Sequence, residues 1–242
     1  MKSVIIFAIC VFIMSCNNDN YEEIEQTLNT YIQGRVIEKG AVIACAASDY
    51  STGNILTFYY PEAGASNIRL YQTATSNIDS DEYSNYNQVF IQNEPFFNGY
   101  LGKYELIDEN EKWIIVTFEL DNEVKISNPI RSKQVTKPTV WNNAVTIDKT
   151  SFGMPIFNWE DNPVGDNAIY FQVVSDRNNS LLSGTYTYEN QFQYYKTDNL
   201  VLNVTTQTPP DLFPKEEYNF TLMDVSSDNW VNWVVQKPFE VQ

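Results

Sequence analysis

The spacing of short apolar runs along the chain restricts the fold more than any other feature. Runs of β-branched and aromatic residues are separated by clusters of Asn, Asp, Gly, Ser and Pro at intervals of about ten residues, a spacing typical of antiparallel strands and not of βαβ units. Helical periodicity is limited to Ile24, Leu28 and Ile32, at positions i, i+4 and i+8. The pattern therefore predicts an all-β protein built from sandwiches.

The length of 242 residues and the number of runs predict two tandem sandwiches. We expect the first over residues 35–134, with strands at 40–47, 55–60, 67–73, 88–92, 99–107, 112–120 and 124–132. We expect the second over residues 138–242, with strands at 156–159, 168–175, 185–188, 192–195, 200–206, 218–223 and 230–235. Residues 133–138 are polar, and Pro138 favours an extended residue before it, so this segment is predicted to be a linker.

A tight turn is predicted between two strands of the first half. The apolar run 113–118 leads into Asp121 and Asn122, residue types that form turns and tolerate positive φ. The chain then returns through Val124 and Ile126. A hairpin at the end of the first sandwich follows from this pattern.

One motif near the C-terminus is specific to a known fold. It consists of the residues Leu212-Phe213-Pro214-Lys215-Glu216-Glu217-Tyr218. This segment resembles the Leu-x-Pro-x-x-x-Tyr turn of fibronectin type III domains. The resemblance implies that Leu212 packs under the sandwich, that Pro214 shapes the crossover, and that the Tyr218 hydroxyl bonds back to the preceding backbone as a tyrosine corner. Trp159 matches the core tryptophan of that family.

The fibronectin type III resemblance covers about residues 138–242 and is weaker in the first half. There it rests on Ser127-Asn128-Pro129-Ile130, which is similar to the segment leading into a last strand, and the Leu-x-Pro-x-x-x-Tyr turn is missing. We therefore expect the first sandwich to be a divergent copy of an immunoglobulin-like or fibronectin type III-like domain.

The N-terminus resembles the signal peptide of a bacterial lipoprotein. Lys2 precedes an uncharged apolar run at 4–14, which has the length of a secretory signal and is shorter than the roughly 20 residues of a transmembrane helix. The residues Ile13-Met14-Ser15-Cys16 resemble the lipobox. This resemblance implies that residues 1–15 are removed and that lipid on Cys16 holds the protein on a membrane.

The segment behind Cys16 is polar and acidic, and residues 16–34 are expected to act as a tether. Its residues 17–23 are similar to the segment that directs lipoproteins of the Bacteroidetes group to the cell surface. Taken as a whole, the chain resembles surface lipoproteins of that group, a family with no assigned activity. The resemblance implies a lipid-anchored outer-membrane protein, with the cell-surface face favoured.

Charge and composition exclude several function classes. Only 15 Lys and Arg stand against 31 Asp and Glu, so a nucleic-acid partner is not expected, because phosphate backbones require clustered basic residues. The chain contains no histidine, which removes His-dependent triads and His-ligated zinc. Once Cys10 leaves with the signal and Cys16 is lipidated, Cys45 is alone in an apolar run, and we expect it in the core.

No cofactor or metal site is predicted, and the chain is not expected to be an enzyme. The acidic residues Asp79, Asp81 and Glu82 lack the glycine turn and distal Glu of an EF-hand. Glu160 and Asp161 are adjacent on a predicted strand end, where neighbouring side chains diverge, so they are not expected to form a general acid pair.

Aromatic residues supply the candidate binding positions. Phe97 and Tyr100 lie among loop-forming residues, and Tyr186 and Tyr188 lie on a predicted strand. The alternative for all four is core or cross-strand packing, which is the commonest use of such rings. Trp230 and Trp233 are an odd number of residues apart in a strand and should face opposite sides, which predicts one in the core and the other exposed.

Three functions remain open from the sequence. The first is a non-catalytic outer-membrane lipoprotein that acts as a binding or interaction module through its loops and sheet edges. The second is a glycan-binding accessory protein of a polysaccharide-uptake system, which requires exposed Trp or Tyr faces. The third is an enzyme, which requires a pocket with convergent carboxylates of perturbed pKa. The sequence leaves the identity of the protein or glycan partner open.

Overall fold

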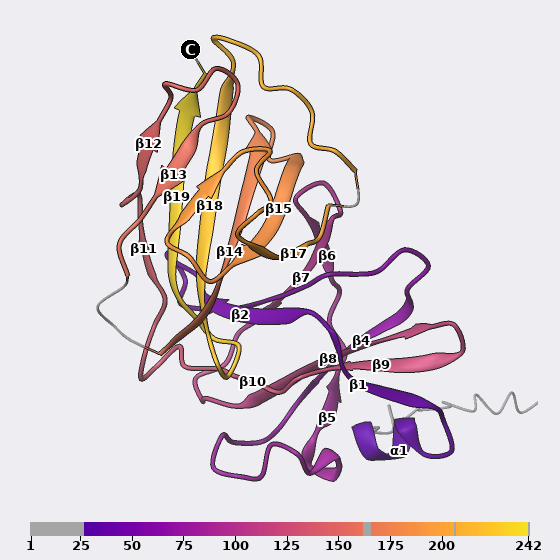
Figure 1. Cartoon of the computed structure of the whole chain (residues 1–242). Helices are drawn as coiled ribbons and strands as arrows, with labels where there is room; N and C mark the ends of the chain where they lie inside the picture. The colour runs from indigo at the N-terminus through magenta and orange to yellow at the C-terminus, as the bar shows by residue number, and fades with distance from the viewer. Residues whose placement is uncertain (1–26, 162–165, 206, 242) are drawn as a thin grey trace, which may run out of the picture.

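The computed structural model describes residues 27–161, 166–205 and 207–241, and the predicted signal peptide, Cys16 and residues 17–26 of the predicted tether lie outside this part of the chain. The described residues form two immunoglobulin-like sandwiches, one drawn in the lower and one in the upper half of Figure 1. The fold is therefore all-β, as the spacing of apolar runs predicts. Within the described residues, no helix is long and apolar enough to cross a membrane.

The first sandwich contains a sheet with the order β1-β9-β8-β4-β5, in which β10 also pairs with β8, and a sheet with the order β2-β3-β7-β6. The strands of the first sheet are β1 (Ile37–Val42), β4 (Ser66–Gln72), β5 (Asn87–Val89), β8 (Trp113–Leu120), β9 (Glu123–Ser127) and β10 (Ile130–Arg131). Those of the second are β2 (Ala44–Ser48), β3 (Ile55–Tyr59), β6 (Glu94–Phe96) and β7 (Leu101–Leu106). The helices α1 (Leu28–Ile32) and η1 (Tyr83–Asn85) cover the outer face of the first sheet.

The second sandwich contains a sheet with the order β11-β19-β18-β14-β15-β17 and a smaller sheet with the order β12-β13-β16. The strands of the large sheet are β11 (Val140–Asn142), β14 (Asn167–Asp176), β15 (Leu181–Thr187), β17 (Leu200–Asn203), β18 (Glu217–Ser226) and β19 (Val231–Glu240). Those of the small sheet are β12 (Thr146–Asp148), β13 (Ile156–Asn158) and β16 (Gln191–Gln193).

The two sandwiches share one topology. Each begins with two short strands in different sheets, β1 and β2 in the first and β11 and β12 in the second, and β1 and β11 run parallel to the final long strand of their sandwich. The sequence instead predicts one strand over 40–47. Gly40 has a φ of +72° and lies in a bulge of β1, after which the chain leaves the first sheet at Ile43 and enters the second. The three-residue strands β6, β11 and β12 are too short for the periodicity to reveal.

The two predicted turns are confirmed. Asp121 and Asn122 both have positive φ and join β8 to β9 in register, as a tight hairpin requires. In the tyrosine corner, the backbone N–H of Phe213 donates to the Tyr218 hydroxyl at 2.9 Å, and Leu212 is buried in the core of the second sandwich. Trp159 also belongs to that core.

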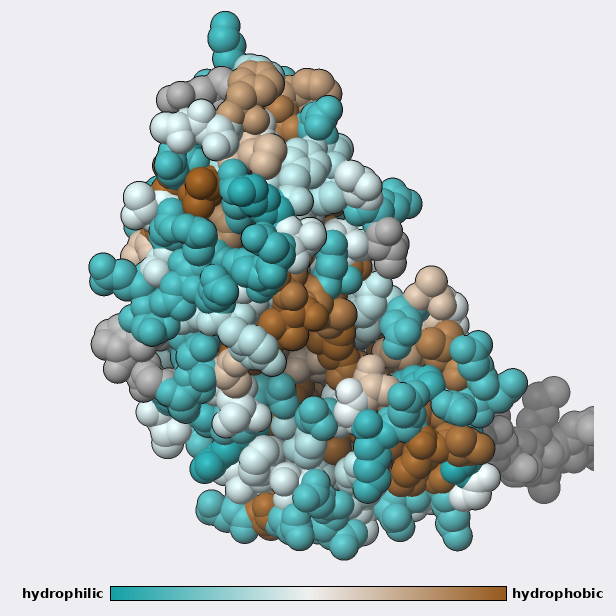
Figure 2. Space-filling model, viewed as in Figure 1, coloured by the Kyte–Doolittle hydropathy of each residue, from teal (hydrophilic) through white to brown (hydrophobic). Residues whose placement is uncertain are grey.

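A continuous apolar core joins the two sandwiches. The outer face of the β2-β3-β7 sheet contributes Leu56, Phe58 and Leu101 to it, and the outer face of the large second sheet contributes Met223 and Val234. The inner face of that same sheet packs within the second sandwich. The central strands β14, β18 and β19 are therefore buried on both faces. Figure 2 shows apolar surface where the two sandwiches meet.

Trp230 connects the sandwiches more directly. It belongs to the turn between β18 and β19 of the second sandwich, yet it lies fully buried in the core of the first, at 0% exposure. The Ala46 backbone N–H of β2 donates to the carbonyl of Asn229 at 3.0 Å, so the turn pairs with the first sandwich. Trp233 packs in the core of the second sandwich. The two tryptophans face opposite sides as predicted, but both are buried, because each side is a core.

The predicted linker at 133–138 is tied to this turn. The indole N–H of Trp230 donates to the Lys137 carbonyl at 2.9 Å. The Lys133 ammonium forms an ion pair with Asp228 at 2.7 Å, and Lys137 forms one with Asp166 at 2.9 Å. These contacts hold the connecting segment against the second sandwich, and the Thr136 backbone N–H, which donates to Glu111 at 2.8 Å, holds it against the first.

Trp230→Ala should destabilise both sandwiches together. Removing a fully buried indole leaves a cavity that costs about 3–5 kcal/mol, and the cavity opens in the first sandwich although the residue belongs to the second. Urea unfolding followed by tryptophan fluorescence and by circular dichroism measures this loss. Tyr188→Ala, at an exposed position, is the control. A loss confined to a separate transition of the second sandwich would contradict the shared core.

Candidate functional site

The structure divides the four predicted binding aromatics into two pairs. Phe97 is only 4% exposed and lies in the core between the sandwiches. Tyr186 packs against the same core, and its ring stacks on Phe171 with centroids 4.6 Å apart. Tyr100 and Tyr188 are exposed, at 38% and 65%. The set therefore does not form one surface, because two of its members hold the sandwiches together.

Cys45 also lies at the junction of the sandwiches. It packs against the core that contains Phe58 and Met223, and burial raises the pKa of its thiol to about 12. The residue as a whole is only half-buried, because part of it remains at the surface. A thiol with this pKa is inert at neutral pH, which agrees with the packing role expected from the sequence.

A cleft at the side of the second sandwich is the strongest candidate site in the described part of the chain. It has a volume of about 810 Å³, within the usual range of ligand pockets. It opens between β11 and β13, at the edge where the large and small sheets part. Its lining residues are Val140, Asn142, Asn143, Ala144, Val145, Thr146, Asn158, Trp159, Glu160, Asp161, Trp233 and Lys237.

Two tryptophans form the apolar part of the cleft. Trp159 follows β13 and Trp233 lies on β19, so the two indoles come from different sheets. The Trp233 indole N–H meets no acceptor in hydrogen-bond geometry among the described residues, although its nitrogen is buried. The Trp159 indole N–H interacts with the Tyr170 hydroxyl and opposes the rise in the pKa of that hydroxyl. Trp159 lies edge-on against Tyr170, with ring centroids 5.3 Å apart. Buried donors without an acceptor, such as that of Trp233, are rare in folded proteins.

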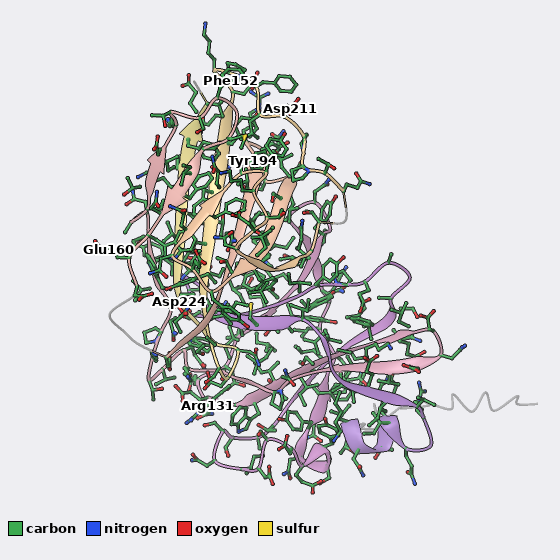
Figure 3. The ribbon with its side chains drawn as sticks, viewed as in Figure 1. Arg131, Phe152, Glu160, Tyr194, Asp211 and Asp224 are labelled. Atoms are coloured by element: carbon green, nitrogen blue, oxygen red, sulfur yellow. The ribbon has the colours of Figure 1, made fainter. Side chains whose placement is uncertain are left out.

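Carboxylates and a lysine form the polar part. Asp161 accepts hydrogen bonds from the Tyr170 hydroxyl at 2.5 Å and from the Asn190 amide at 2.9 Å, and these bonds lower its pKa. Glu160 is exposed and projects from the side of the sandwich (Figure 3). The Lys237 ammonium donates to the Val145 carbonyl at 2.7 Å. A carboxylate with a lowered pKa is the opposite of a general acid at neutral pH, so Asp161 is ionised there and acts as a hydrogen-bond acceptor.

Asp224 is a buried carboxylate on the same sheet. It lies opposite Trp233 in the β18–β19 pairing and is 1% exposed. Burial raises the pKa of Asp224, and the hydrogen bond from the Asn167 amide, at 2.8 Å, opposes this shift. Figure 3 shows Asp224 toward the foot of the second sandwich, near the first.

The sequence predicts Trp159 in the core and does not predict a general acid pair at Glu160 and Asp161, and it assigns none of the three to a binding site. What the sequence did not reveal is that Trp233 and Asn143 come to the same place, because β11 is too short for the pattern to show. No group of three or more His, Cys, Asp or Glu side chains within the described residues is arranged to hold a metal ion.

No protein-family model and no curated protein matches the chain. Among solved structures, the selenomethionine-substituted chicken interferon gamma receptor alpha chain is similar, with 10% identity over 82% of this chain and 96% of that chain, and a TM-score of 0.25. The receptor tyrosine kinase Torso, from a study of neurohormone perception, has 12% identity over 86% of this chain and 76% of that chain, with a TM-score of 0.28. Both TM-scores are below 0.5, so neither likeness bears on what this chain binds.

Asp224→Asn should stabilise the protein at neutral pH. The folded-state pKa of Asp224 is raised above its unfolded value, so stability decreases as the pH rises above the unfolded pKa of about 3.9 and the buried carboxyl ionises. The variant cannot ionise and should have the higher urea midpoint at pH 7.5, with the difference vanishing at pH 3.5. Asp198→Asn, at an exposed position, is the control. A variant less stable than wild type at pH 7.5 would contradict this prediction. It would show that the hydrogen bonds to the Asp224 carboxylate stabilise the fold by more than burial of the charge destabilises it.

Proposed function

We propose that the protein is a non-catalytic binding module, anchored to the outer membrane by lipid on Cys16, and that its ligand site is the cleft beside Trp159 and Trp233. The fold and the lowered pKa of Asp161 support a binding role. The lipobox resemblance at Ile13-Met14-Ser15-Cys16 supports the anchor. The outer membrane, with the cell-surface face favoured, follows from the acidic tether.

The observation that carries this proposal is the Trp233 indole in the wall of the cleft, whose buried N–H meets no acceptor among the described residues. Leaving a buried donor without an acceptor costs about 1–3 kcal/mol. A ligand that brings an oxygen acceptor into the cleft, directly or through an ordered water, would offset this cost at Trp233. A cost carried by the free protein and removed on binding is characteristic of a functional site.

The core between the sandwiches supports the same role. Strand β19 carries Trp233 on its inner face and Val234 on its outer face. Packing on both faces holds the wall of the cleft in one position, and a pre-formed site loses less conformational entropy on binding.

The second candidate function is a glycan-binding accessory protein of a polysaccharide-uptake system. The polar lining of the cleft favours it, because the amides of Asn142, Asn143 and Asn158 can donate to and accept from hydroxyl groups, and the carboxylates of Glu160 and Asp161 can accept from them. Neutral, hydroxyl-rich ligands fit such a lining better than anionic ones do.

Blocking the cleft should remove the ligand. Ala144 is an exposed residue of the cleft wall, and Ala144→Trp fills the opening without touching the core. Protein recovered from native outer membranes is analysed by native mass spectrometry and by glycan assay. We expect a bound species on wild type and on the exposed control Glu109→Ala, and at least a tenfold reduction on Ala144→Trp and Glu160→Ala. A bound species retained by both cleft variants would contradict the assignment.

Cys16→Ser should release the protein from the membrane. Without a thiol no acyl chain is attached, and lipid chains supply the membrane affinity of an anchored protein. We expect wild type in the detergent phase of a Triton X-114 partition and Cys16→Ser in the aqueous phase. Cys45→Ser is the matched control and should partition with wild type. Equal partitioning of wild type and Cys16→Ser would disprove lipidation at this residue.

A further inference from the structure

A second hollow lies where the two sandwiches meet, beside the cleft but on the other side of β11. It has a volume of about 540 Å³, and its lining residues are Asp49, Tyr50, Trp141, Asn142, Asn143 and Gln236. Asp49 and Tyr50 belong to the turn after β2 in the first sandwich, and the others belong to the second. The hollow therefore exists only because the sandwiches are held together.

The turn that carries Tyr50 is held by its own hydrogen bonds. The Asp49 carboxylate oxygen Oδ1 accepts from the backbone N–H groups of Ser51 and Thr52 at 2.9 and 2.8 Å and from both hydroxyls. These bonds lower the pKa of Asp49 to about 2, so it is ionised at neutral pH. Because the turn is fixed, the Tyr50 ring, which is 80% exposed, is presented from a rigid base.

Trp141 provides a second fixed ring. Its indole N–H donates to the Ser48 carbonyl at 2.9 Å, which ties β11 to the end of β2. The residue pairs with Val234 on β19 and packs partly on the core between the sandwiches. Trp141 is thus anchored on one side and remains partly exposed toward the hollow.

The polar groups around these rings are three side-chain amides and one carboxylate. Asn142, Asn143 and Gln236 each offer an N–H donor and a carbonyl acceptor. The four hydrogen bonds that the Asp49 carboxylate accepts from Ser51 and Thr52 all end on Oδ1, which leaves Oδ2 to accept from a ligand. Aromatic faces beside amides suit a ring that carries C–H groups on its faces and hydroxyls on its rim, which is the structure of a pyranose. The net charge of −16 opposes an anionic ligand.

We propose that this hollow binds a neutral sugar ring, with Tyr50 and Trp141 as the stacking surfaces and the amides of Asn142, Asn143 and Gln236 as the hydroxyl partners. The hollow shares Asn142 and Asn143 with the tryptophan-lined cleft, whereas Tyr50, Trp141 and Gln236 line only the hollow. A proline-rich peptide is the other ligand that aromatic hollows bind. Such a peptide has few hydrogen-bond donors, so it cannot satisfy the three amides and one carboxylate of this hollow.

The test is affinity electrophoresis of the lipid-free chain from residue 17 in gels that contain mannan, dextran, laminarin or arabinoxylan, with polygalacturonate as the anionic comparison. We expect at least one neutral polysaccharide to retard wild type and polygalacturonate not to do so. Tyr50→Ala should weaken this retardation at least tenfold. Because Tyr50 is exposed and its turn is held by Asp49, the variant should unfold at the wild-type temperature.

Two matched controls separate this site from others. Tyr188→Ala removes another highly exposed tyrosine, and Glu160→Ala alters a residue that lines only the cleft; both should be retarded as wild type is. The proposal is overturned if no neutral polysaccharide retards wild type, if Tyr50→Ala binds as wild type does, or if wild type binds a fluorescent proline-rich peptide and Tyr50→Ala does not. Loss of retardation on Glu160→Ala with none on Tyr50→Ala would assign the sugar to the cleft, which sustains the proposed function and overturns this inference.

Discussion

The structure depends on one sheet whose three central strands are packed on both faces. Strands β14, β18 and β19 close the second sandwich with one face and cover the first sandwich with the other. The turn between β18 and β19 then places Trp230 in the core of the first sandwich. Apolar burial on this scale is the dominant stabilising contribution in a folded protein, so the two sandwiches behave as one unit. Both hollows, the cleft and the one beside Tyr50, are built on strands that this shared core fixes.

Much of this fold could be predicted from the sequence, and the reason lies in local chemistry. The turn at Asp121 and Asn122 requires positive φ, which these residue types tolerate, and the Tyr218 corner has a seven-residue sequence motif. Both features could therefore be predicted from local sequence. The junction left no clear signal in the sequence. Strands buried on both faces are typically apolar without interruption, but Asn219, Thr221 and Asp224 interrupt β18 and Asn232 interrupts β19. Expecting one exposed face on β19 led to the wrong prediction that either Trp230 or Trp233 is exposed.

The candidate sites were less predictable, because they are assembled from short strands and turns. Trp159 was found as a core residue, but its partners in the cleft come from β11 and β19, which only tertiary structure brings together. Tyr50 lies in a loop with no aromatic neighbour in sequence, and Trp141 reaches it across the junction. Phe97 and Tyr186 were chosen because rings cluster there, and such clustering reflects packing more often than recognition.

The position of Trp230 also governs when the first sandwich can fold. Its last strand ends at Arg131, but its core lacks the indole until the β18–β19 turn has been made. A chain synthesised from the N-terminus must therefore keep its first sandwich incomplete until nearly all of the second has been made. Contacts this distant in sequence slow folding.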